Sequence, residues 1–413
     1  MAATNIKTQL ALASATLLAS GAQAEQEQAG QFYNKWNVDV GYLHYSEPDY
    51  ITVDTYMAMI NGDLSDKDTI KLGLVFDTLS GATPTGALPG SESVTVSGAS
   101  GNASAEGSKG GTAPFNDTRL AMDVTWGHEW QRLLKSKSGI HVSVEGDYTS
   151  VGGSLAVEMN NKDKSQTLSL GVGVASDKVS RSSEQTPSPL TESADSVMFG
   201  AGHKNTYDVM VGLTQVINRR TVAMLNLSYS QSLGYHTDPY KVVSIADKDD
   251  AELTTVFEHR PDNRQRYIMY SKVNHELPEN GHHLSLSYRL HVDSWDLNSH
   301  TFEGSYSFPF MEKHKLEPFA RIYHQQAASF HTRTINYSGS GTFDTVTLPE
   351  YASADARLAQ MLSTTVGAKF RYMTSKTGSI DFRAAYYYRE YTNAILSSDD
   401  ALFFVVDLGK SFQ

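Results

Sequence analysis

The stretch His283-Leu284-Ser285-Leu286-Ser287-Tyr288-Arg289-Leu290-His291-Val292-Asp293-Ser294-Trp295 decides the fold class that this sequence predicts. In it, leucine, tyrosine and valine alternate with serine, arginine, histidine and aspartate. Successive side chains of a β-strand point to opposite faces, so this alternation predicts a strand with one apolar and one polar face. The pattern holds for about ten residues, the length that a tilted strand needs to cross the hydrocarbon of a bilayer.

The same two-residue period recurs along the chain and predicts sixteen strands. Two of these segments are weaker than the rest, because 153–160 is short and 264–275 is poorly patterned, so fourteen strands is the alternative count. The sixteen segments are 36–45, 50–60, 69–78, 118–131, 139–150, 153–160, 164–175, 204–218, 221–233, 264–275, 282–294, 299–310, 315–330, 356–371, 378–391 and 401–412.

The connections between these segments alternate between short and long. Those after even-numbered segments are short, and all the long ones follow odd-numbered segments. Such sorting is typical of a barrel with a periplasmic and an extracellular rim. The sequence therefore predicts an all-β fold, a single antiparallel transmembrane β-barrel with short periplasmic turns and long extracellular loops. The long connections are 79–117, 176–203, 234–263 and 331–355.

The N-terminal residues have the pattern of a secretory signal peptide. Lys7 supplies the only charge before the short apolar run Leu10–Ala19, and Ala22-Gln23-Ala24 is an A-x-A cleavage site. We expect cleavage after Ala24, so that residues 1–24 are the signal peptide and 25–413 the barrel domain in the outer membrane of a Gram-negative bacterium. The expected partners are outer-membrane lipid and the barrel assembly machinery, because the last strand closes with Phe412, one residue before Gln413.

The composition agrees with this class of protein. The chain has 413 residues, 40% of them hydrophobic, which is too few for a helical membrane protein but suits a barrel whose strands present one polar face. A net charge of −12 argues against nucleic acid as a partner. The absence of cysteine argues against a small disulfide-stapled domain.

The sequence carries no motif for catalysis, a metal or a cofactor. It contains neither a G-x-S-x-G elbow nor an H-E-x-x-H pair. The acidic run Ala246–Glu252 could bind calcium, but its spacing does not match an EF-hand loop, and acidic runs are usually solvated loops. His291 and Asp293 share a face with Arg289 and could orient a nucleophile, but no serine is placed beside them, so we expect no enzyme.

The expected inward faces carry many charges of both signs, with acids such as Asp54, Asp123 and Asp208 mostly in the first half and arginines in the second. An unpaired charge is costly in a medium of low dielectric, so these groups must either meet water or pair across the lumen. Our candidates for lumen-lining residues are Arg289, His291, Asp293, Arg321, Arg383, Arg389, Glu145 and Asp147.

A second set of candidates lies where strands are expected to leave the membrane. Glycine and proline after the third segment predict a rigid turn, and Asp238-Pro239-Tyr240 predicts the start of another. We expect these rim residues to fold the loops inward, with ligand contact as the alternative. The rim candidates are Asp77, Gly81, Pro84, Gly86, Asp238, Pro239 and Tyr240.

Several motifs resemble the family of Gram-negative outer-membrane barrels known as domain of unknown function 3570. The resemblance covers nearly the whole mature chain; Ser80, Thr83 and Thr85 depart from it. It implies an outer-membrane location, and a neighbourhood of small envelope lipoproteins and flavin-transferase-type proteins in a redox-linked assembly. The matching motifs are Asp77–Ala87, Asp147–Ser150, Gly234–Lys241, Arg260-Pro261-Asp262, Tyr288-Arg289, Asp293-Ser294-Trp295, Ser299-His300, and Arg321 with Tyr323 and Gln325.

Three classes of function follow. The first is a porin-like channel for small solutes, since a barrel of about sixteen strands is wide enough for an aqueous path. We expect its conductance to be small and to rise when Ser91–Gly111 is removed. The second is a structural or partner-binding barrel, which could hold a small envelope lipoprotein. The third is an outer-membrane hydrolase, which lacks a nucleophile motif.

Overall fold

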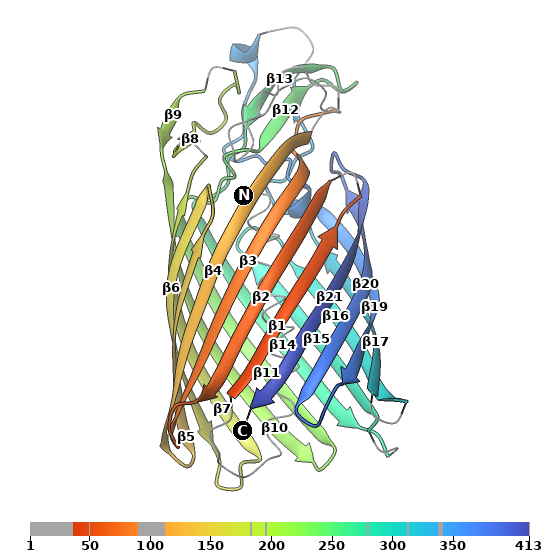
Figure 1. Ribbon diagram of the computed structural model, residues 1–413. Coiled ribbons are helices and arrows are strands. Elements are labelled where there is room, and N and C mark those ends of the chain that lie inside the picture. Colours follow the sequence, from red (N-terminus) through yellow and green to blue (C-terminus); the bar gives the residue numbers. More distant parts are fainter. Residues whose placement is uncertain are drawn as a thin grey trace.

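The computed structural model shows a closed barrel of sixteen antiparallel strands, tilted against the barrel axis (Figure 1). The structure describes residues 36–48, 50–89, 112–181, 184–194, 196–278, 281–311, 314–337 and 342–412. The signal-peptide prediction and the segment 91–111 lie outside these residues.

The wall is formed by strands that pair with their neighbours in chain order, and β1 pairs with β21 to close the barrel. Strand labels skip the elements outside the wall. The wall strands are β1 (Trp36–Ser46), β2 (Ile51–Asp63), β3 (Asp68–Pro84), β4 (Thr112–Gln131), β5 (Leu134–Val144), β6 (Tyr148–Asn160), β7 (Gln166–Val179), β10 (Gly202–Asn218), β11 (Thr221–Gly234), β14 (Asn263–Glu276), β15 (His283–Asp293), β16 (Ser299–Phe310), β17 (His314–Gln325), β19 (Gln360–Met373), β20 (Gly378–Thr392) and β21 (Ser398–Phe412).

The outer surface of the wall is an apolar band. Leu286 of β15 is 52% exposed and lies opposite Val273 of β14, which is also exposed. The same outward alternation of exposed leucine, valine and aromatic side chains continues around the barrel. Such a surface is stable only against lipid, because the exposed apolar area far exceeds what a protein in water shows. Among the described residues, no helix is long and apolar enough to cross a bilayer.

The prediction of sixteen strands is confirmed, and the alternative of fourteen is wrong. Both weak segments are wall strands: β6 extends to thirteen residues, and β14 pairs with β11 and β15 along its length. The turns after β2, β4, β6, β10, β14, β16 and β19 are short, as expected, and lie at the rim opposite the long loops (Figure 1).

The boundary error that changes the candidate site concerns Glu145 and Asp147. We expected both on a strand reaching residue 150, but β5 ends at Val144, and the Glu145 backbone N–H donates to the Tyr148 carbonyl. The chain therefore reverses between these two acids. The two-residue period continues across the turn by coincidence, so Glu145 and Asp147 lie at the extracellular rim and not on the lumen wall.

The interior near β1, β2 and β21 is not uniformly polar. A buried apolar cluster on the inner face joins these strands, with Tyr50, Val75, Tyr387 and Phe403 packed against it. Both faces of β2 are apolar, so the pattern there does not reveal which side faces the lumen. The cluster consists of Leu43, Tyr45, Ile51, Val53, Met57, Leu79, Ala401 and Val405.

The long extracellular loops contain ordered elements that the sequence did not predict. A three-stranded sheet and a two-stranded sheet lie beyond the upper ends of the wall strands (Figure 1). We call these elements and the loops that join them the cap. Its elements are β8 (Gln185–Pro187), β9 (Met198–Gly200), β12 (Val242–Ala246), β13 (Glu252–Phe257), β18 (Ile335–Asn336), η2 (Phe343–Thr345) and η3 (Ala356–Leu358).

Candidate functional site: the lumen wall and its cap

Two arginines project into the lumen and remain exposed. Arg289 of β15 and Arg321 of β17 stand on the polar face of their strands, opposite the lipid-facing residues. Among the described residues, neither side chain has an ion pair or hydrogen bond. A guanidinium carries a permanent charge and five donors, so both must be solvated or bind a solute.

The strand register brings these two side chains close to one level. Arg289 lies opposite Thr301 of β16, and Thr301 lies opposite Tyr323 of β17, two residues along the strand from Arg321. Because the strands are tilted, residues paired across neighbouring strands lie at different heights along the barrel axis. The offset of two residues along β17 therefore leaves Arg321 at nearly the height of Arg289. Arg266 of β14, four residues along the strand from the register partner of Arg289, adds a third guanidinium on the same inner face.

Arg266 and Arg383 flank this pair on the same side of the barrel. Arg266 donates to the Ser230 hydroxyl at 2.7 Å, while its Nε is buried without a partner. The guanidinium of Arg383, on β20, stacks over the Phe319 ring at 4.3 Å from the centroid. Arginines therefore line the wall from β14 to β20.

Acidic groups stand on the opposite wall. Asp123 of β4 accepts a hydrogen bond from His141 of β5 or shares its proton, at 2.8 Å, and both side chains are exposed to the lumen. Asp208 of β10 is exposed as well, but it lies on the arginine side of the barrel, two strands from β14. Charges of both signs thus stand on each side of the lumen, since Glu303 of β16 faces Arg321 in the register and Asp381 of β20 pairs with Arg371 at 2.8 Å.

His291 and Asp293 are held by neighbours and are not available as a catalytic pair. Asp293 is buried and accepts hydrogen bonds from Arg264 Nε at 2.8 Å and from the Trp295 and Leu297 backbone. His291 Nε2 lies 3.5 Å from the same carboxylate. This carboxylate anchors the turn after β15, and among the described residues no hydroxyl nucleophile contacts His291.

Arg389 belongs to a rim cluster and not to the open lumen. Its guanidinium binds Glu47 in the turn between β1 and β2, and it donates from Nε to Asp399 at 2.5 Å. The Tyr45 hydroxyl donates to the same Glu47 at 2.5 Å. The pair ties β20 to the β1–β2 turn, so this candidate has a structural role.

The candidates at the end of β3 lie within a strand instead of a turn. Asp77 is 2% exposed on the inner face and accepts a hydrogen bond from Arg119 Nε at 2.5 Å. Gly81 is paired with Ile51, with φ of +133°, and a Cβ on it would lie 2.0 Å from the Tyr50 carbonyl oxygen. The prediction of a turn at Gly81 is wrong, because β3 continues to Pro84. Glycine is needed at this position because the backbone of Tyr50 lies too close to leave room for a side chain.

The other rim candidates meet in the cap. Pro84 accepts a hydrogen bond from Lys241 Nζ through its carbonyl oxygen. Gly86 has φ of +97° and packs against the Val242 carbonyl, where a Cβ would stand 2.2 Å away. Residues 157 positions apart are thus joined, and the end of β3 is fixed to the start of β12.

A buried ionic network holds this junction. Glu258 is fully buried and pairs with Arg260 at 2.6 Å; it also accepts hydrogen bonds from the Asp238 backbone at 2.7 Å and from Ser353 at 2.5 Å. Arg260 also donates to Asp355 at 2.9 Å. Pro239 is buried beside Asp238, and Tyr240 lies under the Arg181 guanidinium at 5.3 Å. Asp238, Pro239 and Tyr240 therefore stabilise the folded arrangement of the extracellular loops.

The electrostatics of the network follow from burial and from close opposite charges. Burial raises the pKa of Glu258 and lowers the pKa of Lys241. Burial alone would also raise the pKa of Asp355, but the charges of Arg357, Lys241 and Arg260 hold it well below its usual value. Each buried charge thus depends on its partners.

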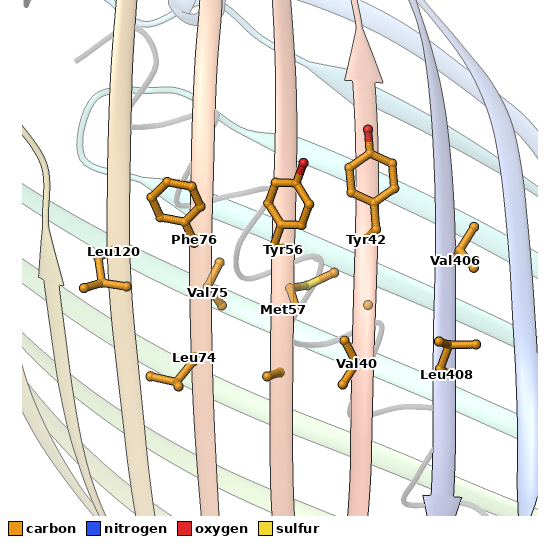
Figure 2. Close-up of a pocket in the computed structure, with 12 residues that line it drawn as sticks. Val40, Tyr42, Tyr56, Met57, Leu74, Val75, Phe76, Leu120, Val406 and Leu408 are labelled. Atoms are coloured by element: carbon orange, nitrogen blue, oxygen red, sulfur yellow. The ribbon is translucent and has the colours of Figure 1, made fainter.

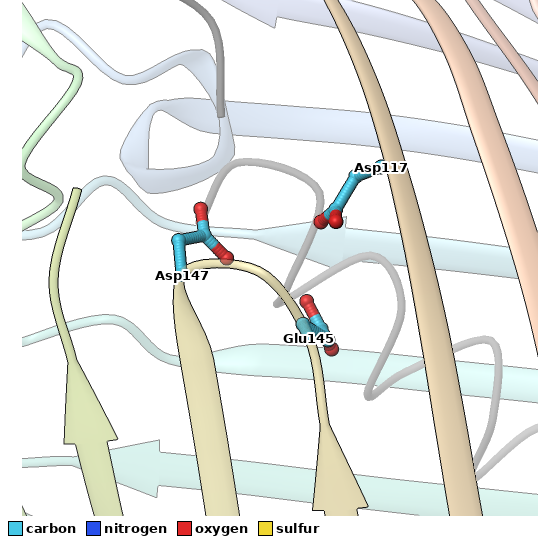
Figure 3. A group of neighbouring side chains, drawn as sticks. All are labelled: Asp117, Glu145 and Asp147. Atoms are coloured by element: carbon cyan, nitrogen blue, oxygen red, sulfur yellow. The ribbon is translucent and has the colours of Figure 1, made fainter. Parts of the chain in front are cut away.

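Three carboxylates converge at the extracellular rim. Asp117 on β4 meets Glu145 and Asp147 from the β5–β6 turn, with ligand oxygens within 4.8 Å of one another (Figure 3). Three negative charges at this distance repel, and either a shared proton or an oxygen-seeking cation would relieve the repulsion. The sequence analysis named Glu145 and Asp147 but missed Asp117, which the strand register brings beside them.

The acidic run that could have bound calcium is the hairpin turn between β12 and β13. Asp250 forms a bidentate pair with Arg333, at 2.6 and 2.8 Å. The Asp247 carboxylate accepts hydrogen bonds from the backbone of Asp249 and Ala251. These carboxylates are used to shape the turn and to dock it on a neighbouring loop.

An apolar groove of about 470 Å³ lies on the outer face over β1, β2 and β3 (Figure 2). Tyr42, Tyr56 and Phe76 form a row along it, with ring centroids 5.3 and 6.4 Å apart. Asp54, which we expected in the lumen, lies on this outer face and accepts a hydrogen bond from Tyr42 at 2.7 Å. The groove therefore lies on the outer face of the wall and not in the lumen.

Residues 7–402 match a protein family described as "Protein of unknown function (DUF3570)". The chain belongs to this family. The resemblance found in the motifs is thereby confirmed. No curated protein is significantly similar to the chain in sequence.

Solved structures with a similar outline are outer-membrane barrels. A bacterial polysaccharide outer membrane secretin is 8% identical, with a TM-score of 0.44, covering 93% of this chain and 100% of that one. The outer membrane protein OpdK from Pseudomonas aeruginosa is 8% identical, with a TM-score of 0.42 and coverage of 92% and 99%. The CymD monoaromatic hydrocarbon channel is also 8% identical, with a TM-score of 0.41 and coverage of 93% and 90%.

Proposed function

We propose that this protein is an outer-membrane channel for small solutes, with a water-filled lumen narrowed by its extracellular cap. The observation that carries the proposal is the exposure of Arg289 and Arg321 on the inner wall, with exposed Asp123 of β4 on the opposite side of the barrel. Charged side chains without partners require water around them, and a row of such groups supplies a polar path through the bilayer.

The proposal includes export and insertion. The signal peptide is cleaved after Ala24, and the assembly machinery inserts the barrel into the outer membrane. N-terminal sequencing of the mature protein checks the cleavage site. Comparing unheated with boiled samples on a gel checks the folded barrel, since a folded barrel migrates differently from the unfolded chain.

Conductance across a planar phosphatidylcholine bilayer tests the channel itself. We expect stepwise currents in potassium chloride. A folded protein without current, prepared from heat-modifiable material, would contradict the proposal.

A partner-binding barrel is the second candidate, and one observation favours it. Strand β9 and the residue before it present exposed apolar side chains beyond the barrel wall, with Val197 at 63%, Met198 at 39% and Phe199 at 57% exposure. Apolar residues grouped at a strand edge are typical of an interaction surface. Purification from membranes with a stoichiometric envelope lipoprotein, lost when Phe199 is replaced by Ser, supports this candidate.

A further inference from the structure

The exposed arginines of the inner wall, Arg289 and Arg321, have different neighbours from the arginines of the rim and the cap. In the strand register Arg289 lies opposite Tyr270 of β14 and Thr301 of β16, and neither neighbour is a carboxylate. Arg264, which lies two residues before Arg266 on β14, is instead paired with Asp293 at 2.5 Å. The lumen thus holds a local excess of positive charge between β14 and β17.

The acids near this group do not cancel its charge. Glu303 of β16 stands directly opposite Arg321 in the strand register, but no ion pair joins them. Asp208 acts on Arg266, whose guanidinium is already bound to Ser230. One carboxylate therefore faces two exposed guanidiniums, Arg289 and Arg321.

The surroundings also offer contacts for a carbon skeleton. Tyr270 lies opposite Arg289 across the β14–β15 pair, and Tyr323 stands on the same face as Arg321, two residues away. Tyrosine combines an apolar ring with a hydroxyl and therefore suits a ligand with both polar and apolar parts. Guanidinium groups prefer planar oxyanions, which they bind through paired hydrogen bonds.

We propose that Arg289 and Arg321, with Arg266 beside them, form a binding site for a small oxyanionic solute in the lumen. The site takes a carboxylate or a phosphate group between the two exposed guanidiniums, while the tyrosines contact the rest of the molecule. The inference rests on the proposed channel function for its route of access, but binding itself can be measured without transport.

The test uses the folded full chain in detergent, with succinate and inorganic phosphate as separate probes in a calorimetric titration. We expect one or both anions to bind. The double variant Arg289→Ala/Arg321→Ala should weaken binding by roughly tenfold or more, the effect of losing one hydrogen bond between charged groups. Succinate binding alone assigns the site to carboxylates, and phosphate binding alone assigns it to phosphates.

Two further variants separate this site from a general effect of lumen charge. Lys71→Ala removes another inward cation, on β3, and should leave binding unchanged. Arg289→Lys/Arg321→Lys keeps both charges but loses the planar donors, so it should bind more weakly than the native protein. Equal binding in the native protein and the double alanine variant, an equal loss in Lys71→Ala, or no binding of either probe overturns the proposal.

A bilayer measurement keeps this inference distinct from the channel function. If the protein conducts, the double alanine variant should still conduct. Its reversal potential should shift toward the equilibrium potential of the cation, and the anion that binds should block its current less. Conductance without anion binding leaves the channel standing and removes the site. Anion binding without conductance supports the binding site and contradicts the channel function.

Discussion

Two groups of arginines in this molecule carry the same charge in opposite settings. In the cap, Arg260 is 3% exposed and is bound on two sides, by Glu258 and Asp355. On the lumen wall, Arg321 is exposed and has no such partner among the described residues. A buried charge remains stable only with its partners in place, whereas a solvated one is free to meet a ligand. The first group therefore holds the structure, and the second is the candidate for function.

Replacing one arginine from each group breaks this comparison most directly. Arg260→Ala leaves Glu258 and Asp355 buried without their shared cation, which should destabilise the cap by about 3–5 kcal/mol. Arg321→Ala removes an exposed side chain without a partner and should change stability by less than about 1 kcal/mol. Protease susceptibility of the extracellular loops on intact cells reports the cap. Equal susceptibility in the two variants would mean that burial does not separate the groups.

The lipid-facing side of the wall gives the next largest effect. Leu286→Arg places a charge in the hydrocarbon and should cost about 2–4 kcal/mol near the bilayer midplane. Ser287→Arg, one residue along β15, adds the same side chain on the lumen face and should cost much less. Folding into lipid vesicles over a urea series measures both. Similar costs would show that β15 does not have one face in lipid and the other in the lumen.

The wall could be predicted from the sequence because its physics is local and periodic. A strand with lipid on one side and water on the other must alternate, so the residues around Leu286 reveal both the strand and its faces. The prediction fails where this contrast disappears. In β2 both faces are apolar, and Asp54 was assigned to the lumen although it contacts Tyr42 on the outer face.

The cap could not be predicted in the same way. Val242-Val243-Ser244-Ile245-Ala246 is buried throughout and shows no alternation, so β12 has no two-residue signal. The partners of Arg260 include Asp355, 95 positions away in the chain. Asp117 likewise reaches Glu145 and Asp147 only through the pairing of β4 with β5. Such contacts depend on how loops meet, and no short motif encodes them.

Gly81 lies where the wall meets the cap, and replacing it tests how much the stability of that junction depends on glycine. A Cβ there would lie 2.0 Å from the Tyr50 carbonyl oxygen, and its φ of +133° is strained for any other residue. Gly81→Ala should therefore cost about 1–3 kcal/mol. Gly200→Ala is the matched control, because nothing lies within 4 Å of a Cβ at that position. The urea midpoints of the two variants should differ clearly, with Gly200→Ala close to the native protein.

The last prediction is a pH dependence of the cap. His236 donates from Nδ1 to the Gly234 carbonyl at 2.7 Å, its Nε2 is buried without a hydrogen-bond partner among the described residues, and its ring meets Trp295 edge-on at 5.5 Å. Burial, with the nearby charge of Lys204 as the next cause, lowers the pKa of His236 to about 3. The unfolded loop therefore binds a proton near pH 6.5, where the folded loop does not. The resulting stability is complete above pH 6.5 and is lost as the pH falls toward 3, at up to about 1.4 kcal/mol per pH unit.

The lowered pKa values of His331 and Asp355 act in the same direction, and the raised pKa of Glu258 opposes them. We therefore expect the extracellular loops to become more sensitive to an acid-active protease between pH 6.5 and 4, while the wall resists it. His236→Phe keeps the aromatic contact with Trp295 but cannot be protonated, so it should reduce this pH dependence. A cap whose protection is constant over this range in the native protein, or unchanged in its slope by His236→Phe, would show that the buried histidine does not set the acid response.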